Sequence, residues 1–305
     1  MRWLTMGKSD EVEKKSQLAS INGKLDQLGE VLRASHDQLA LCVERCTKLS
    51  DLLLYQQTLN LQKSHPNPLN RFGKKCFSQT DEDGITLEIV RRLDITCNGV
   101  FAEFGVGNGL ENNTLILACL GWRGFWVGGE KLAFHLVPSN KFTYIEGWIT
   151  ADNIAGLARK GMGFLQAGQI DVVSLDLDGN DIYFVRTLLE NNVAPKLFIV
   201  EYNAKFPPPV RFQIQYNPDH RWSGDDYFGA SLCSFTDLFT EHGYRLICCN
   251  SHTGANAFFI HADHQHLFRD VPTDIGDIYV GPRYHLYENY GHPASARVVE
   301  EILNS

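Results

Sequence analysis

The sequence predicts an α/β protein, with a mostly parallel sheet flanked by helices and preceded by a long N-terminal helix. Three observations lead to this prediction. Apolar runs of strand length alternate with helical stretches beyond residue 73, which is typical of parallel sheets. A glycine-rich turn follows the first of these runs, at the place where such sheets bind ligands. Before residue 64, leucines recur with the spacing of a coiled coil.

The composition is that of a soluble, globular protein. At 305 residues, with 44% hydrophobic content, the chain has room for one sizeable packed domain and an appendage. A formal net charge of −8 argues against a general nucleic-acid binder. The eight cysteines include no Cys-x-x-Cys pair, so we expect reduced thiols. Without a secretory apolar run or a segment of membrane-spanning length, we expect a cytoplasmic location.

The N-terminal helix carries a heptad pattern. Its seam positions alternate by three and four residues, at Leu18, Ile21, Leu25, Leu28, Leu32, Ser35, Leu39, Cys42, Cys46, Leu49 and Leu53. A narrow stripe with a 3.5-residue period favours self-association through a coiled coil. The alternative is an amphipathic helix that lies on its own domain. Gly23, Gly29 and Ser35 lower the intrinsic stability of this helix.

The helix should end near Pro66 and Pro68, because proline lacks an N–H and disfavours helical geometry in the preceding residue. We therefore assign residues 1–63 to the helix, 64–73 to a linker and 74–305 to a globular domain. In that domain we expect strands at 99–104, 124–127, 142–146, 171–177, 196–202, 244–249 and 257–260, and helices at 83–93, 115–120, 231–241 and 294–303. The last two strands are close enough to form an antiparallel edge pair.

The turn after the first strand has glycine at positions one, three and five, which are Gly105, Gly107 and Gly109. Glycine lets the backbone bend sharply and come close to a ligand, and the following helix start offers free N–H groups. A dinucleotide fingerprint needs glycine at position six, where this chain has Leu110. Glu103 stands two residues before the first glycine. Such a turn can also form without any ligand.

Polar and aromatic residues follow the next strands, whose carboxyl ends should meet at one edge of the sheet. After the second strand, Glu130 could accept hydrogen bonds from both hydroxyls of a ribose. After the third, Trp148 could stack on adenine while Asp152 reads its amino edge. In the alternative interpretation, Glu130 and Asp152 are solvated loop residues and Trp148 is a core or lid aromatic.

Asp176, Asp178 and Asp181 follow the fourth strand. Carboxylates this close repel one another unless they are protonated, hydrogen-bonded or bound to a cation. With Glu201 from the next strand, Asp176 and Asp178 would offer oxygen ligands suited to Mg²⁺ or Ca²⁺, and such a metal would lower the pKa of a bound hydroxyl. Alternatively, Asp176 or Asp178 acts as a general base and Asp181 caps the following helix.

The segment 204–230 mixes prolines, aromatic residues and carboxylates. We expect it to close over the site and exclude water; the alternative is a surface insertion with its own small cluster. His220 in this segment and His252 further along are candidate bases, ranked below Asp178. The residues that we expect to contact the substrate are Glu201, Tyr202, Asn203, Asp225 and Tyr227.

Together these features resemble the class I S-adenosylmethionine (SAM)-dependent methyltransferases, in particular the FkbM-like family, over residues 74–262. The resemblance rests on the glycine turn and on a Ser-Gln…Glu-Asp-Gly pattern within residues 77–84. It implies a Rossmann-like seven-stranded sheet whose last strand inserts antiparallel, with SAM as cofactor. It also implies a set of cofactor-binding residues: Gln79 and Asp83 at the methionine end, Glu103, Gly105, Gly107 and Gly109 around the cofactor, and Glu130 at the ribose. Lys131 stands where the family often has a proline.

The sequence therefore predicts a SAM-dependent O-methyltransferase acting on a hydroxyl of a glycan, sugar or glycosylated metabolite, with Asp176, Asp178 and His252 as candidate catalytic residues. Two alternatives remain. Asp176 and Asp178 fit the Asp-x-Asp of a metal-dependent glycosyltransferase, and a coiled-coil scaffold could carry a catalytically silent domain. We expect self-association through the helix and no nucleic-acid partner. The stretch 263–305 gives no functional prediction.

Overall fold

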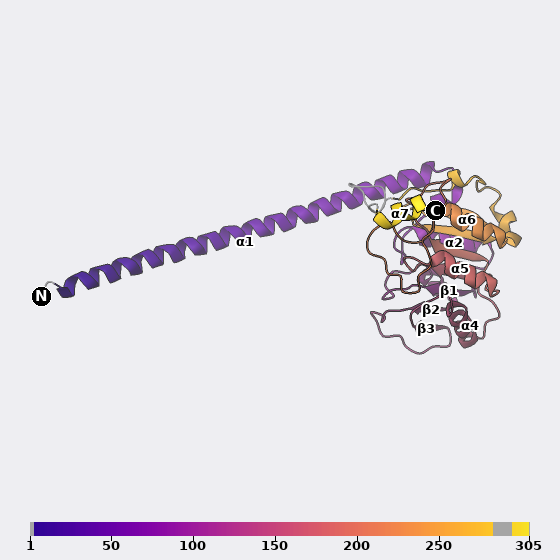
Figure 1. The fold of residues 1–305 in the computed structure, drawn as a ribbon, viewed down its shortest axis with the longest axis horizontal. Helices are drawn as coiled ribbons and strands as arrows, with labels where there is room; N and C mark the ends of the chain where they lie inside the picture. The colour runs from indigo at the N-terminus through magenta and orange to yellow at the C-terminus, as the bar shows by residue number, and fades with distance from the viewer. Residues whose placement is uncertain (1–2, 283–294, 305) are drawn as a thin grey trace. The chain divides into compact units, whose positions relative to one another are not determined.

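The computed structural model describes residues 3–282 and 295–304 (Figure 1). The chain forms two compact units, Met1–Gln56 and Gln57–Ser305. The described part of the first unit is one continuous helix, α1 (Trp3–Ser64), whose last residues belong to the second unit. No helix in the described ranges is both long enough and apolar enough to cross a membrane.

The first unit confirms the predicted helix. Its leucine and isoleucine seam residues each expose more than half of their surface, namely Leu18, Ile21, Leu25, Leu28, Leu32, Leu39, Leu49 and Leu53. The seam cysteines, Cys42 and Cys46, are exposed as well. Acidic residues such as Glu30, Asp37 and Glu44 lie outside the seam positions. The stripe is thus available to another helix, and self-association stays a prediction.

The second unit is built on one seven-stranded sheet with strand order β3-β2-β1-β4-β5-β7-β6. The strands are β1 (Val100–Phe104), β2 (Arg123–Gly128), β3 (Phe142–Glu146), β4 (Val172–Leu175), β5 (Leu197–Glu201), β6 (Tyr244–Cys249) and β7 (Asn256–His261). Strands β1 to β5 are parallel, and β7 runs antiparallel to both β5 and β6. The predicted Rossmann-like architecture is confirmed, including the inserted antiparallel strand.

Helices flank this sheet. They are α2 (Glu82–Arg92), α3 (Leu115–Cys119), α4 (Ile154–Leu165), α5 (Asp181–Glu190), α6 (Leu232–Glu241) and α7 (Ala296–Asn304), with short 3₁₀ helices η1 (Pro68–Phe72), η2 (Ala262–Phe268) and η3 (Ile275–Asp277). Helix α4 packs against β2 and β3, and α6 packs against β6. Phe239 of α6 stacks on Phe259 of β7 with ring centroids 4.0 Å apart. The buried strands read as continuous apolar runs, as expected of a sheet covered on both faces.

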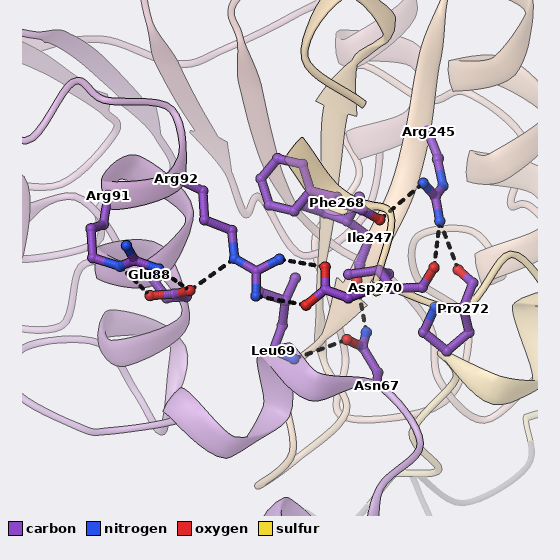
Figure 2. Close-up of polar contacts among 11 residues, drawn as sticks. Asn67, Leu69, Glu88, Arg91, Arg92, Arg245, Ile247, Phe268, Asp270 and Pro272 are labelled. Carbon is purple, nitrogen blue, oxygen red and sulfur yellow. Dashed lines mark hydrogen bonds and ion pairs between the residues drawn. The ribbon is translucent and has the colours of Figure 1, made fainter. Parts of the chain in front are cut away.

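Residues 64–73, which the sequence suggests as a linker, carry buried side chains. The amide Nδ2 of Asn67 donates to the carbonyl of Ile247 in β6 at 2.7 Å, and its Oδ1 accepts the N–H of Leu69 at 3.0 Å (Figure 2). Leu69 is completely buried. This segment therefore packs into the second unit, which begins at Gln57.

Much of the stretch after β7 is also fastened to the sheet domain (Figure 2). The guanidinium of Arg92 in α2 donates to both carboxylate oxygens of Asp270, at 2.7 and 3.0 Å. Arg245 of β6 donates to the carbonyls of Phe268 and Pro272 at 3.3 and 3.0 Å. These contacts give residues 263–282 a structural role; the rest of 263–305 lies partly outside the described residues.

Candidate functional site

A cavity of about 840 Å³ opens at the carboxyl ends of the parallel strands. The glycine turn after β1, the ends of β2, β4 and β5, and the loop before α6 contribute to its walls. Asn256 joins them from the start of β7, because this antiparallel strand brings it opposite Glu201. The cavity contains many of the sequence-predicted residues: Gln79, Glu103, Gly105, Gly107, Glu130, Trp148, Asp176, Asp178 and Glu201.

Two glycines of the turn differ in the space around them: Gly105 is packed against protein backbone, whereas Gly107 has open space beside it. Gly105 has φ +91°, and a β-carbon there would collide with the carbonyl oxygen of Asp176. Gly107 has φ +49°, and a β-carbon there would meet no atom within 4 Å. Both backbone conformations favour glycine. Gly107 therefore presents bare backbone to the cavity, which is what close approach of a ligand needs. Gly109 lies outside the lining and packs beside Leu132 and Phe134.

Glu103 holds the turn in shape. Its carboxylate accepts the N–H of Asn113 at 2.8 Å, and the N–H of Thr114 at 3.1 Å together with that residue's hydroxyl. Two N–H groups immediately before α3 are thus satisfied by a residue of β1. Burial raises the pKa of Glu103 to about 7. Its hydrogen bonds make Glu103 mainly a positioning residue for the loop.

Three carboxylates meet at the β4 and β5 ends. Oxygens of Asp176, Asp178 and Glu201 lie within 4.8 Å of one another. Burial and the neighbouring negative charges raise the pKa values of Asp176 and Glu201 well above their usual range. Partial desolvation also raises the pKa of Asp178, although this residue is exposed at the surface. Asp178 adopts φ +54°, an uncommon conformation for a residue other than glycine. The geometry suits either a shared proton or a cation.

Asp181 has a different role from its neighbours. It accepts the backbone N–H groups of Leu177 and Gly179 at 2.8 and 2.9 Å, and burial raises its pKa to about 6. It begins α5 and fixes the turn that carries Asp178. The N–H groups that it accepts come before α5, so Asp181 shapes the preceding turn and does not cap the helix, which corrects the alternative expected from the sequence.

Several buried polar atoms around the cavity have no hydrogen-bond partner among the described residues. They are Oε2 of Glu201, Nε2 of His220, Oδ1 of Asn256, and both Oδ1 and Nδ2 of Asn112. Buried polar atoms are normally paired, so their concentration around one cavity points to a ligand. Sequence reasoning missed Asn112 and Asn256. Their position after the glycine turn and at the start of β7 was visible, but their unpaired state was not.

Other predicted residues lie outside the cavity lining and have structural contacts. One carboxylate oxygen of Asp83 accepts the N–H groups of Cys76, Phe77 and Ser78 at 2.7 to 2.9 Å, which shapes the segment before Gln79. The Tyr202 hydroxyl donates to the carbonyl of Val280 at 3.0 Å. These two side chains therefore hold neighbouring segments in place without lining the cavity.

The remaining predicted residues also have contacts away from the cavity. Asn203 donates to the carbonyls of Asp226 and Phe228, and Asp225 accepts the N–H of Tyr227 at 3.0 Å. Tyr227 packs on the small apolar cluster that contains Phe206, Phe212 and Ile214. The backbone N–H of His252 donates to Asp81 at 3.0 Å, and Asp152 is exposed before α4. None of these five residues lines the cavity.

Part of the segment 204–230 does reach the cavity. His220, Arg221 and Trp222 line it. The Nε1 of Trp148 donates to the carbonyl of Pro218 at 2.9 Å, and the guanidinium of Arg221 lies 4.7 Å from the Trp148 ring centroid. Trp148 therefore contacts the segment 204–230, as expected if it is an aromatic residue of a lid rather than a platform for adenine.

Comparison with known proteins gives distant structural similarities. No family model matches the chain, and no curated protein does either. One similar structure is magnesium protoporphyrin IX methyltransferase (ChlM) from Synechocystis PCC 6803 with bound SAH, at 10% identity and TM-score 0.38, covering 62% of this chain and 90% of that one. Precorrin-6y C5,15-methyltransferase from Geobacter metallireducens GS-15 matches at 12% identity and TM-score 0.34, with coverage of 62% and 90%.

A third similar structure is the MycE methyltransferase of mycinamycin biosynthesis, in complex with Mg, SAH and mycinamycin VI, at 18% identity and TM-score 0.27. The match covers 38% of this chain and 31% of MycE, so less than a third of that protein's length is represented. These identities and TM-scores are too low to place the chain in a family. The fold assignment rests on the strand order of the sheet itself.

Proposed function

We propose that the second unit is a SAM-dependent methyltransferase that acts on a hydroxyl of a glycan, sugar or glycosylated metabolite. One observation carries the proposal: the bare backbone at Gly107 faces a cavity that is also lined by the carboxylates of Asp176, Asp178 and Glu201. A ligand held by the turn would thus have its reactive end near acidic groups that could take a proton.

The cavity fits SAM in size and charge. Its volume of about 840 Å³ lies within the range of small-molecule sites. Six carboxylates line it, against the single guanidinium of Arg221 in the described lining: those of Glu103, Glu111, Glu130, Asp176, Asp178 and Glu201. SAM carries a net positive charge at neutral pH, so the exposed carboxylates of Glu111, Glu130 and Asp178 favour it over an anionic nucleotide sugar. Gly105, Gly107 and Glu130 would hold the cofactor.

The chain's own residues supply positioning and proton transfer. When bound, SAM provides a methyl group activated by its positively charged sulfur. Asp178 would accept the hydroxyl proton of the acceptor, because a raised pKa makes its carboxylate a stronger base than an ordinary aspartate. The segment around His220 and Trp222 would exclude water and fix the acceptor beside Asp178.

In an alternative form of the proposal Asp178 is not the base: Asp176, Asp178 and Glu201 would instead hold a Mg²⁺ ion, which would orient the acceptor's hydroxyls and favour their deprotonation. We expect Mg²⁺ to bind the wild-type protein in calorimetry, and Asp178→Asn to weaken that binding at least tenfold. Methyl transfer should fall on addition of a chelator and recover with Mg²⁺. Unchanged activity in the presence of the chelator would show that no metal is needed, without contradicting the methyltransferase proposal.

Substitution of Gly107 tests cofactor binding. We expect SAM to bind the wild-type protein in calorimetry and a UDP-sugar not to bind. Gly107→Arg should abolish SAM binding, because its side chain would extend into the cavity. Gly121→Arg is the matched control: Gly121 has φ +84° and open space too, but lies in the turn before β2, at the opposite edge of the sheet. Equal SAM binding by both variants, or tight UDP-sugar binding, would contradict the proposal.

The proposal includes self-association of the chain through α1, with a cytoplasmic location. The exposed seam of α1 supports the first part. The cysteines in the described residues are all free thiols, which suits a reducing compartment.

A further inference from the structure

Asn112 is a buried amide without a partner. The residue exposes 3% of its surface, and neither its Oδ1 nor its Nδ2 has a hydrogen-bond partner among the described residues. Asn112 is one of the residues that line the cavity. A carboxamide offers one acceptor oxygen and two donor hydrogens, so an amide buried here calls for a ligand group that both accepts and donates.

The two ends of the loop that carries Asn112 contact the chain on opposite sides of β1, which lies between β2 and β4 in the sheet. At its start, the carbonyl of Asn108 accepts the N–H of Ala133, in the segment after β2, at 2.8 Å. At its end, the amide of Asn113 donates to the hydroxyl of Ser174 in β4 at 3.1 Å. Asn112 therefore lies at the β4 side, away from Glu130 and Trp148, which follow β2 and β3.

The backbone of Asn112 ties this side of the loop to the segment before α2. Its N–H donates to the carbonyl of Phe77 at 3.2 Å, two residues before Gln79, which also lines the cavity. Asn256 presents a second unpaired buried oxygen on the same side of the sheet, beside Glu201. Unpaired hydrogen-bond donors and acceptors of the described residues are thus found together on the β4 and β5 side of the cavity, away from β2 and β3.

We propose that Asn112 binds the aminocarboxylate end of the cofactor, with Nδ2 donating to the carboxylate and Oδ1 accepting from the ammonium group. This inference rests on the proposed function. It places the adenosine toward β2 and β3, where Glu130 and Trp148 line the cavity, and the amino-acid end toward β4. Asn112 is then a specificity-determining residue, which distinguishes ligands that carry an aminocarboxylate from ligands that lack it.

Two ligands separate this role from any other. S-adenosylhomocysteine (SAH) carries the aminocarboxylate, whereas 5′-methylthioadenosine has the same nucleoside and sulfur but lacks it. In calorimetry we expect Asn112→Ala to weaken SAH at least tenfold and methylthioadenosine less than twofold, since hydrogen bonds to charged groups are the stronger ones. Asn112→Asp should weaken SAH at least as much, because it replaces the donor by a like charge facing the ligand's carboxylate.

Asn108→Ala is the matched control, since Asn108 lies in the same loop at the β2 side. Asn108→Ala should change the affinities for SAH and for methylthioadenosine by the same factor. Thermal unfolding without ligand should be unchanged in Asn112→Ala, because its amide has no partner within the described protein. Equal weakening of both ligands, or of neither, would overturn the inference. If the wild-type protein binds neither ligand, the proposed function is wrong, and the inference that rests on it is wrong as well.

The seam of α1 supports a second, independent inference about how two copies meet. Cys42 and Cys46 occupy adjacent seam positions, and both are exposed free thiols. The positions that flank the seam include Lys24 and Arg45. In a fully overlapped antiparallel pair, Lys24 of one copy would face Arg45 of the other, and like charges beside the seam repel.

A parallel, in-register pair avoids this repulsion. Lys24 then faces Gly29 of the second copy, and Arg45 faces Ser50. We infer that α1 pairs with α1 of a second copy in parallel and in register, which brings Cys42 opposite Cys42 and Cys46 opposite Cys46. In the antiparallel arrangement each cysteine would face a leucine or isoleucine instead.

The native thiols report this arrangement directly. With the azo oxidant diamide, which takes up the two electrons and two protons released by a pair of thiols, the full-length protein should form a covalent dimer on a non-reducing gel. Cys46→Ser should still cross-link through Cys42, whereas the double variant Cys42→Ser/Cys46→Ser should not, although it keeps exposed Cys76, Cys97 and Cys119. Equal cross-linking by the double variant, or a wild-type protein that sediments as a monomer, would overturn the inference.

Discussion

At the scale of single residues, the role of each carboxylate in the site depends on its hydrogen-bond partners. Glu103 stabilises the glycine turn through three accepted hydrogen bonds, and Asp181 does the same for the turn after β4. Asp176, Asp178 and Glu201 are left to face the cavity. The division explains why equally acidic neighbours differ in role: a carboxylate that accepts backbone N–H groups is occupied, and one without such partners is available to a ligand.

The pKa of Glu103 predicts a pH dependence of stability. Burial raises it from 4.5 to about 7, so between these values the folded protein binds a proton that the unfolded chain has released, and stability falls as pH rises. The cost at pH 8 is about 3 kcal/mol. From pH 5 to pH 8, the free energy of unfolding in urea should therefore fall more for the wild-type protein than for Glu103→Gln. Glu111→Gln, an exposed residue of the same loop, should follow the wild type; coincident curves for all three proteins would contradict this prediction.

At the scale of elements, the strand ends and the loop before α6 form the site together. The loop is fastened to the sheet side of the cavity by several hydrogen bonds. The amide of Asn180, at the start of α5, donates to the carbonyl of Asn217 at 2.7 Å, and the Tyr216 hydroxyl accepts the N–H of Ala151 at 3.0 Å. These contacts hold His220 and Trp222 over the carboxylates.

Loosening the loop should slow catalysis more than it changes the fold. Asn180→Ala removes two hydrogen bonds to the backbone of Asn217, at 2.7 and 3.3 Å. At about 1 kcal/mol each, their loss should lower kcat/KM for the acceptor roughly thirtyfold. Amide hydrogen exchange in residues 213–222 should become faster. As a control, Asn191→Ala removes a comparable amide at the other end of α5. It should change neither kcat/KM nor the rate of hydrogen exchange. Unaltered exchange in Asn180→Ala would show that these contacts do not hold the loop.

The strands were predictable from sequence because buried parallel strands are continuous apolar runs with clear ends. The runs at 99–104 and 196–202 match the buried parallel strands β1 and β5 closely, with bounds that differ by one residue at most. Helices α4 and α5 gave weaker signals: α4 contains three glycines, and α5 follows the aspartate cluster directly. The site could be predicted as far as strand ends determine it. Asn112 could not, because the lack of a partner for a buried amide depends on the packing of segments distant in sequence.

At the scale of the whole molecule, the chain combines a helical unit with a sheet unit that contains the cavity. The two are separate in composition and in burial: the seam of α1 is exposed, whereas the strands are buried. An exposed apolar stripe of this length is a common mark of a protein–protein contact.

Added charge in the seam should separate the copies. The double variant Leu25→Glu/Leu32→Glu places like charges at the seam, so it should sediment as a monomer where the wild-type protein sediments as an oligomer. The control Gln27→Glu/Ala34→Glu adds the same charge to the outer face of α1 and should remain oligomeric. A seam variant with wild-type sedimentation would contradict the coiled coil without affecting the site.

The central claim is that the turn at Gly105 and Gly107 lies against a nucleoside cofactor. A crystal structure of the full-length protein with SAH tests it most directly. The account predicts electron density for the nucleoside between Gly107 and Glu130, with the sulfur directed toward Asp178. A cavity filled by protein side chains, or SAH bound elsewhere on the protein, would contradict the claim.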